Sequence, residues 1–184
     1  KMNFLLVIIV VFLMATSFLG FFGSQANQHQ YGESMFEIRN DGLYTEINGY
    51  DTRFDVYPST VEKLHVDAQA LSIIENSPIL WITFPPKASD LSAVDLARFD
   101  LTNFFQQAYG KAVLSGITEE SDIYTLPVKV CDDALTSEPV IMIQESNETG
   151  IFMEAGCILL KGNGTTVVMA KDLLIYHISG IIDG

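Results

Sequence analysis

The side chains able to support acid–base or nucleophilic chemistry are few and widely spaced in this chain of 184 residues. The three histidines are His29, His65 and His177. A serine hydrolase needs its nucleophile on a tight G-x-S-x-G turn with a histidine free to reach it, and Leu114-Ser115-Gly116 lacks the first glycine of that pattern. A single histidine in an apolar helix, such as His177, is more typical of a hydrogen-bonded core residue. The sequence therefore favours no catalytic assignment.

The acidic and glycine-rich stretches also lack the spacing of characterised ligand sites. Asp132-Asp133 and the loop of residues 119–122 offer oxygen ligands of the kind that bind Ca²⁺, but neither follows the D-x-D-x-D-G pattern. Gly162-Asn163-Gly164 precedes a predicted helix, where backbone N–H groups can bind a phosphate, but the stretch has no P-loop lysine. We therefore expect no metal and no cofactor.

Two kinds of covalent modification are predicted if the body of the protein lies outside the cytoplasm. Cys131 and Cys157 are the only cysteines, and an even count in an oxidising compartment favours one disulfide. In a reducing compartment the same residues are better interpreted as two buried thiols. Asn147 and Asn163 each begin an N-x-T triplet in a polar, turn-like stretch, so they are candidate N-glycosylation sites.

An N-terminal apolar stretch predicts where that body lies. Residues 4–22 (FLLVIIVVFLMATSFLGFF) contain no charged side chain, and a helix of that length spans about 28 Å, close to the hydrocarbon thickness of a bilayer. We expect a single transmembrane anchor in residues 1–22 and a polar tether in residues 23–33. Lys1 is the only positive charge before the stretch, and none follows it until Arg39. The positive-inside rule then places the N-terminus in the cytoplasm and the body outside.

Two other interpretations of the apolar stretch stay open. Ser24-Gln25-Ala26 has the small residues that a signal peptidase requires, although the apolar stretch is longer than the roughly 7–15 residues of a typical signal peptide. A hydrophobic N-terminal helix followed by a head is also the plan of type IV pilin-like subunits. Those subunits usually carry a glutamate at the fifth mature position, where this chain has Leu5.

The remaining residues, 34–184, are enough for one domain with its own core. The net charge is −13 and the pI is about 4.4. Nucleic acid is therefore excluded as a partner, because phosphate binding requires basic surface. An acidic body is also repelled by anionic lipid headgroups, so we expect it to stand away from the bilayer.

Hydrophobic periodicity and turn residues predict the elements of this body. Alternating or continuous apolar runs predict strands over residues 35–39, 43–48, 52–57, 79–84, 111–117, 128–131, 140–144, 150–154 and 157–161. Helices are predicted over residues 67–75, from Ser89 or Ser92 to Tyr109 with a break near Thr102, and over 167–179. Hairpins at both ends and alternating strands and helices in the middle predict an α+β fold or an α/β sandwich, with helices packed on a mixed sheet.

These patterns lead to two hypotheses about function. The first is a membrane-anchored structural or interaction subunit of a membrane or cell-surface assembly, with Tyr44, Tyr50 and Tyr57 as its candidate contact face because exposed tyrosine is typical of interfaces. A pilin-like filament subunit is a variant of this hypothesis. The second is an extracytoplasmic enzyme or small-ligand binder with a non-contiguous site, for which His65, His177, Asp132 and Asp133 are the candidates.

Overall fold

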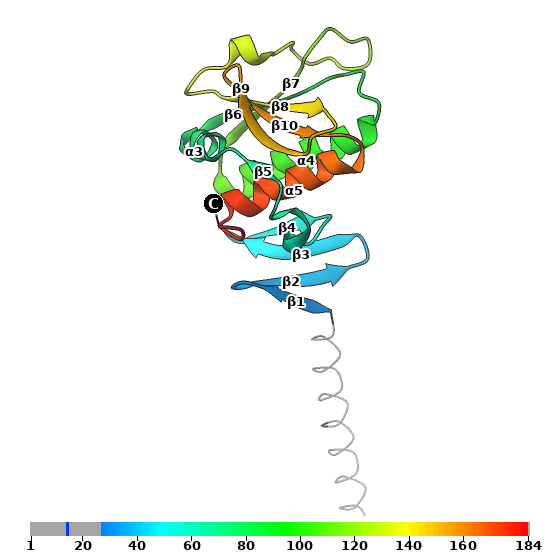
Figure 1. Cartoon of the computed structure of the whole chain (residues 1–184), viewed down its shortest axis with the longest axis vertical. Coiled ribbons are helices and arrows are strands. Elements are labelled where there is room, and N and C mark those ends of the chain that lie inside the picture. Colours follow the sequence, from blue (N-terminus) through cyan, green and yellow to red (C-terminus); the bar gives the residue numbers. More distant parts are fainter. Residues whose placement is uncertain (1–13, 15–26, 184) are drawn as a thin grey trace, which may run out of the picture.

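The computed structural model describes residue 14 and residues 27–183, which form an α+β structure with two β-sheets and helices (Figure 1). The predicted anchor over residues 1–22 therefore lies, apart from Met14, outside the described residues. Among the residues that are described, none of the helices combines the length and the apolar character needed to cross a bilayer.

The N-terminal sheet is an antiparallel meander. Its strands, in spatial order, are β1 (Gln28–Tyr31), β2 (Ser34–Arg39), β3 (Gly42–Ile47) and β4 (Tyr50–Phe54). The predicted turn at Asn48-Gly49 joins β3 to β4, and both residues have positive φ, 52° and 82°, as a tight hairpin requires. β1 lies inside the segment predicted as a polar tether, residues 23–33, and pairs with β2 through His29 and Phe36. The tether prediction therefore differs from the structure over these four residues.

The larger, mixed sheet is built from segments further along the chain. Its strands, in spatial order, are β5 (His65–Val66), β9 (Gly150–Glu154), β10 (Cys157–Gly162), β8 (Val140–Glu145), β6 (Ile79–Phe84) and β7 (Ala112–Ile117). Strands β10, β8, β6 and β7 are parallel to one another, and β9 is antiparallel to β10. The strand predicted over residues 128–131 is absent from the described residues, where only Val128 makes an isolated bridge, to Ile117.

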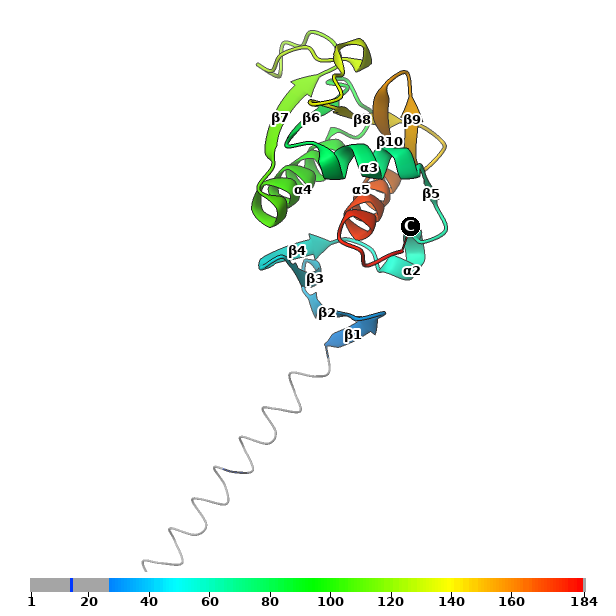
Figure 2. The ribbon, with the colours of Figure 1, turned by 90° about the vertical axis from the view of Figure 1, so that its left-hand side faces the viewer.

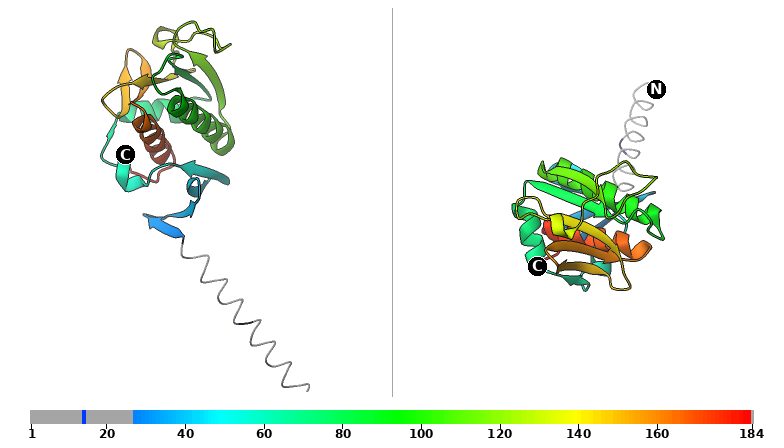
Figure 3. Two further views of the ribbon diagram at one scale, coloured as in Figure 1. Left: turned by 90° about the vertical axis from the view of Figure 1, so that its right-hand side faces the viewer. Right: turned by 90° about the horizontal axis from the view of Figure 1, so that it is seen from above.

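Two long helices lie between the two sheets (Figures 1 and 2). These are α4 (Leu91–Tyr109) and α5 (Thr165–Ile178), and the shorter helices are α2 (Pro58–Val61), α3 (Ala68–Asn76) and the 3₁₀ turn η1 (Cys131–Asp133). α4 is continuous through Thr102, and its N-cap is Asp90, whose Oδ1 accepts a hydrogen bond from Ala93 N, in place of the predicted serines. Seen from above, the strands β8 and β10 lie over α5 (Figure 3).

The core is continuous from one sheet through the helices to the other. Most of α5 is buried, as its nearly uniform apolar surface predicts. Where the core meets the N-terminal sheet, the ring of Tyr176 stacks on Phe54 at 4.3 Å between centroids and meets Phe36 edge-on. These aromatic contacts attach the N-terminal sheet to α5.

Candidate interaction surface

The outer face of the mixed sheet, which is turned away from α4 and α5, carries a second, smaller hydrophobic cluster. Val140, Cys157 and Leu159 are its buried members, with Trp81 and Phe152 partly buried beside them. Residues 118–139 form a long connection from β7 to β8 that lies against this face, and we call it the stapled loop. Without it the apolar side chains of the outer face would lose their cover.

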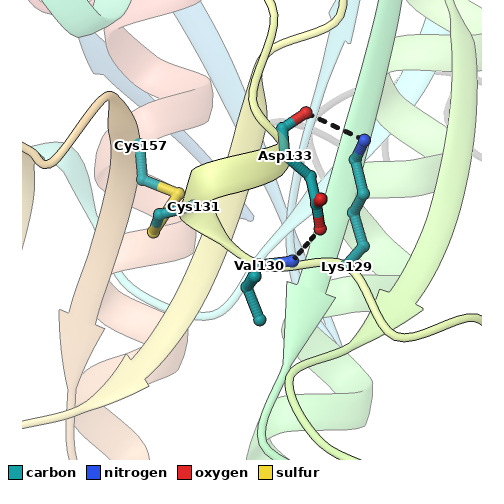
Figure 4. Close-up of a disulfide and its surroundings, with 5 residues drawn as sticks. All are labelled: Lys129, Val130, Cys131, Asp133 and Cys157. Atoms are coloured by element: carbon teal, nitrogen blue, oxygen red, sulfur yellow. Dashed lines mark hydrogen bonds between the residues drawn. A yellow bond between two sulfur atoms is a disulfide. The ribbon is translucent and has the colours of Figure 1, made fainter.

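A disulfide between Cys131 and Cys157 attaches the stapled loop to the sheet (Figure 4). Cys131 opens η1 and Cys157 opens β10, with 5.1 Å between their Cα atoms, so the predicted pairing is confirmed. Next to the disulfide, Lys129 Nζ donates to Asp133 O at 2.9 Å, and Val130 N donates to Asp133 Oδ2 at 3.0 Å. The carboxylate of Asp133 therefore shapes the turn.

Cationic side chains on the outer face are paired with aromatic rings. Lys129 Nζ lies 5.1 Å from the centroid of the Trp81 ring, and Lys161 Nζ lies 4.5 Å from that of Phe152. Lys161 also forms an ion pair with Glu154 at 2.5 Å. The ring of His65 stacks on Phe152 as well, at 4.5 Å between centroids. The ammonium groups of Lys129 and Lys161 are thus already paired within the protein.

Several large apolar side chains nearby are exposed to solvent. Ile123, Leu135 and Val128, all on the stapled loop, are 74%, 57% and 46% exposed, and Leu114 on β7 is 42% exposed. We call these four residues the distal surface, because the stapled loop lies at the opposite end of the described structure from β1 (Figure 1). Three of these side chains come from one loop, and a loop that exposes several large apolar side chains is a candidate for a protein contact.

Two depressions of the described surface are open to solvent. One of about 740 Å³ lies along the stapled loop, with Lys87 and Tyr124 in its wall. Another of about 280 Å³ is lined by Ser89, Glu145 and Asn163, among others. Within residue 14 and residues 27–183, no three His, Cys, Asp or Glu side chains are grouped so as to hold a metal ion.

The two predicted glycosylation sites share the smaller of these depressions. Asn147 follows β8, Asn163 follows β10, and both side chains are exposed. The neighbouring strand ends are in register, with Ser146 N donating to Gly162 O at 2.9 Å. Glycans on the two residues would therefore leave the surface side by side.

The three tyrosines predicted as a contact face do not lie on one face. Strand register places Tyr44 on the side of β3 opposite to Leu43 and Ile47, where Arg39 lies 4.1 Å above its ring. Tyr50 pairs with Ile47 and so shares the face of the core residues. Tyr57 follows β4, and its hydroxyl donates to Gln30 O at 2.7 Å. All three are only partly exposed.

The residues proposed for a catalytic site are placed on different parts of the molecule. His65 lies on β5 at the outer face, whereas His177 lies on α5 between the sheets. Burial lowers the pKa of His177, and its Nδ1 has no hydrogen-bond partner among the described residues. His29 lies on β1, near Tyr57. The structure does not bring these groups together with Asp132 and Asp133, which lie on η1.

A group of buried and partly buried charges between α5, α4 and β4 was not predicted from the sequence. Lys171, on α5, is fully buried, and its Nζ lies 2.8 Å from Asp55 Oδ2, 3.0 Å from Asp100 Oδ2 and 2.5 Å from Asp172 Oδ1. Arg53 adds a second cation, 2.6 Å from Asp55. We call these five residues the charge cluster. It joins the N-terminal sheet to both long helices.

Asp172 is the carboxylate on which this cluster depends most. It is fully buried, and its Oδ2 accepts hydrogen bonds from Asp55 N at 2.7 Å and Val56 N at 2.8 Å. Burial raises the pKa of Asp172 to about 6, although the charge of Lys171 opposes that shift. Burial by itself would lower the pKa of Lys171, but the surrounding carboxylates outweigh it and raise the pKa.

Comparison with known proteins identified no relative: no family model, no curated protein and no solved structure matches this chain.

Proposed function

We propose that this protein is a membrane-anchored structural or interaction subunit of a membrane or cell-surface assembly. Residues 1–22 would be the anchor, with the N-terminus in the cytoplasm and the body outside. The observation that carries the proposal is the distal surface, where Ile123, Val128 and Leu135 are exposed on a loop that a disulfide holds in place. A stabilised loop that keeps apolar side chains in solvent is suited to binding another protein.

Two further features support the proposal. A disulfide is expected of proteins that fold in an oxidising compartment outside the cytoplasm. The stapled loop, which carries three of the four residues of the distal surface, lies at the opposite end of the described structure from β1 (Figure 1). An anchor that precedes residue 27 would therefore leave the distal surface facing away from the membrane.

The test is native mass spectrometry of the untagged full chain, extracted from its own membranes in mild detergent. We expect it to be bound to other subunits or to copies of itself, and a chain that is alone under these conditions would overturn the proposal. Ile123→Asp should remove the bound subunits, because it places a charge in an apolar contact. The control is Ile38→Asp, at a residue that is 43% exposed on the N-terminal sheet and should leave the assembly intact.

A further inference from the structure

The mixed sheet ends at β7, which is an edge strand with β6 as its only neighbour among the strands of that sheet (Figure 2). Ala112 N donates to Pro78 O at 2.9 Å, and Thr118 N donates to Phe84 O at 3.0 Å. In a parallel strand the N–H and C=O of one residue point to the same side, and successive residues alternate. Even-numbered residues of β7 therefore pair with β6, and Val113, Ser115 and Ile117 point outward.

The protein's own chain pairs with only one of these three residues. Ile117 N donates to Pro127 O at 3.0 Å, and Lys129 N donates to Ile117 O at 2.9 Å. If this ladder continued, residue 127 would donate its N–H to Ser115 O, but proline has no N–H. The pairing stops there. Within the described chain the outward N–H and C=O groups of Val113 and Ser115 take part in no backbone pair.

Except at Ile117, which residues 127–129 cover, this edge lacks the features with which proteins usually block such strands. Charged side chains, prolines, bulges or a covering segment prevent an exposed edge from pairing with other chains. The strand Ala112–Ile117, with the sequence AVLSGI, contains no charged residue and no proline. Leu114, one of the four residues of the distal surface, lies exposed beside the edge. The edge is thus open to an added strand.

We propose that the free edge of β7 binds an extended segment of a different subunit by β-strand addition, with an apolar side chain against Leu114 and basic residues at its flanks. This inference rests on the proposed function and names the kind of partner. Main-chain hydrogen bonds to Val113 and Ser115 provide the pairing, as in other cases of strand addition. A second copy of this chain is disfavoured because each copy has a net charge of −13, whereas a segment with basic flanks is attracted by the net charge of the chain as a whole.

Hydrogen exchange at single residues tests the pairing and does not require the partner to be identified first. The full chain is compared in its own membranes and after purification to a monomer. The amides of Val113 and Ser115 should exchange at least tenfold more slowly in the membranes, while those of Leu114 and Gly116, which point toward β6, serve as internal references. Equal exchange of Val113 and Ser115 in the two preparations would overturn the inference.

A proline substitution tests the same edge by its effect on assembly. The N–H of Val113 points outward, so Val113→Pro removes no hydrogen bond to β6 but blocks an added strand. We expect this variant to lose its bound subunit in native mass spectrometry, while Val113→Ala, which keeps the N–H, retains it. An unchanged unfolding midpoint and an intact disulfide establish that the variants are folded, and Ser115→Pro gives an independent second variant.

The outcomes separate this inference from the proposed function. If the chain is bound to other subunits but the Val113 and Ser115 amides exchange freely, the edge proposal is wrong and the proposed function stands. If these amides are protected in a complex that contains only copies of this chain, the inference that the added strand comes from a different subunit is wrong. A chain that is alone in its membranes overturns both.

Discussion

Lys171 Nζ lies 3.0 Å from Asp100 Oδ2, so a fully buried ammonium group on α5 is joined to a carboxylate on α4. The same ammonium group reaches Asp55 next to β4. One side chain therefore connects the three elements that hold the N-terminal sheet on the rest of the protein. A buried ion pair contributes little relative to an apolar pair, but the loss of one partner leaves the other charge buried and unpaired.

Lys171→Met should consequently destabilise the protein strongly. We expect the free energy of unfolding to fall by about 3–5 kcal/mol, because the fully buried Asp172 loses its cation. Asp55 and Asp100 keep Arg53 as a second cation. Urea unfolding of the described body measures the change. Arg39→Met is the control, since Arg39 pairs with Glu37 and Asp51 at an exposed position and its loss should cost far less. Equal losses for the two variants would contradict the role given to the charge cluster.

The raised pKa of Asp172 predicts a dependence of stability on pH. The folded-state pKa of about 6 is above the ordinary value of 3.8, so the native state binds an additional proton between these values. The stability that protonated Asp172 contributes to the folded protein is fully present below about pH 4 and is lost as the pH rises through 6. For a shift of that size the loss is about 3 kcal/mol.

Asp172→Asn removes this titration and provides the measurement. Thermal or urea unfolding of both proteins between pH 4 and pH 7.5 should show the wild type losing stability relative to the variant as the pH rises. The other charged and titratable groups near the Asp172 carboxylate are present in both proteins, so their effects on stability largely cancel in the comparison. These groups are Arg53, Asp55, Asp100, Lys171 and Tyr176. Parallel stability curves over this range would show that Asp172 does not titrate there.

The disulfide predicts a local consequence of reduction. In the chain-entropy model, closing a loop between cysteines with a sequence separation of 26 stabilises the protein by about 3–4 kcal/mol. The stapled loop depends on Cys131 for its attachment to β10, whereas α4, α5 and the N-terminal sheet do not.

Cys131→Ser with Cys157→Ser should therefore release the stapled loop before the rest of the protein unfolds. Limited proteolysis of the variant should cut first within residues 118–139, and the melting temperature should fall. Cleavage that begins in the N-terminal sheet instead would show that the disulfide supports a different part of the structure.

The sequence predicted the elements well where the signal was local. The hairpin at Asn48-Gly49, the apolar run of β6 and the buried helix α5 each follow from a few consecutive residues. The charge cluster was missed because its members come from three elements, with Lys171 and Asp55 separated by 116 positions. The only local signal was the adjacent pair Lys171-Asp172 in an otherwise apolar helix.

The candidate interaction surface could not be predicted from sequence patterns either. The free edge of β7 depends on which strand is last in the sheet, and that order is set by tertiary packing. Pro127 can be read from the sequence, but its effect on the hydrogen bonds of β7 becomes clear only when the structure shows that this segment pairs with Ile117. The tyrosine prediction assumed that Tyr44 and Tyr50 share a face, whereas the register of β3 and β4 separates them.

The paired sequons give a prediction about the location of the body. If residues 34–184 lie outside the cytoplasm of a cell that attaches N-linked glycans, Asn147 and Asn163 are both exposed and available. Because the two asparagines line one depression, a glycan on one residue crowds the other. We expect most chains to carry one glycan, measured as intact mass and by mapping of glycopeptides from the full chain.

Substitution of the threonines separates modification from any structural role of the asparagines. Thr149→Ala removes the first sequon, and the occupancy of Asn163 should rise, because its neighbour no longer carries a glycan. Thr165→Ala should have the converse effect on Asn147. Independent occupancies would contradict the crowding argument, and a chain that lacks glycans in such a cell would count against an extracytoplasmic body, because both asparagines are exposed to a modifying enzyme.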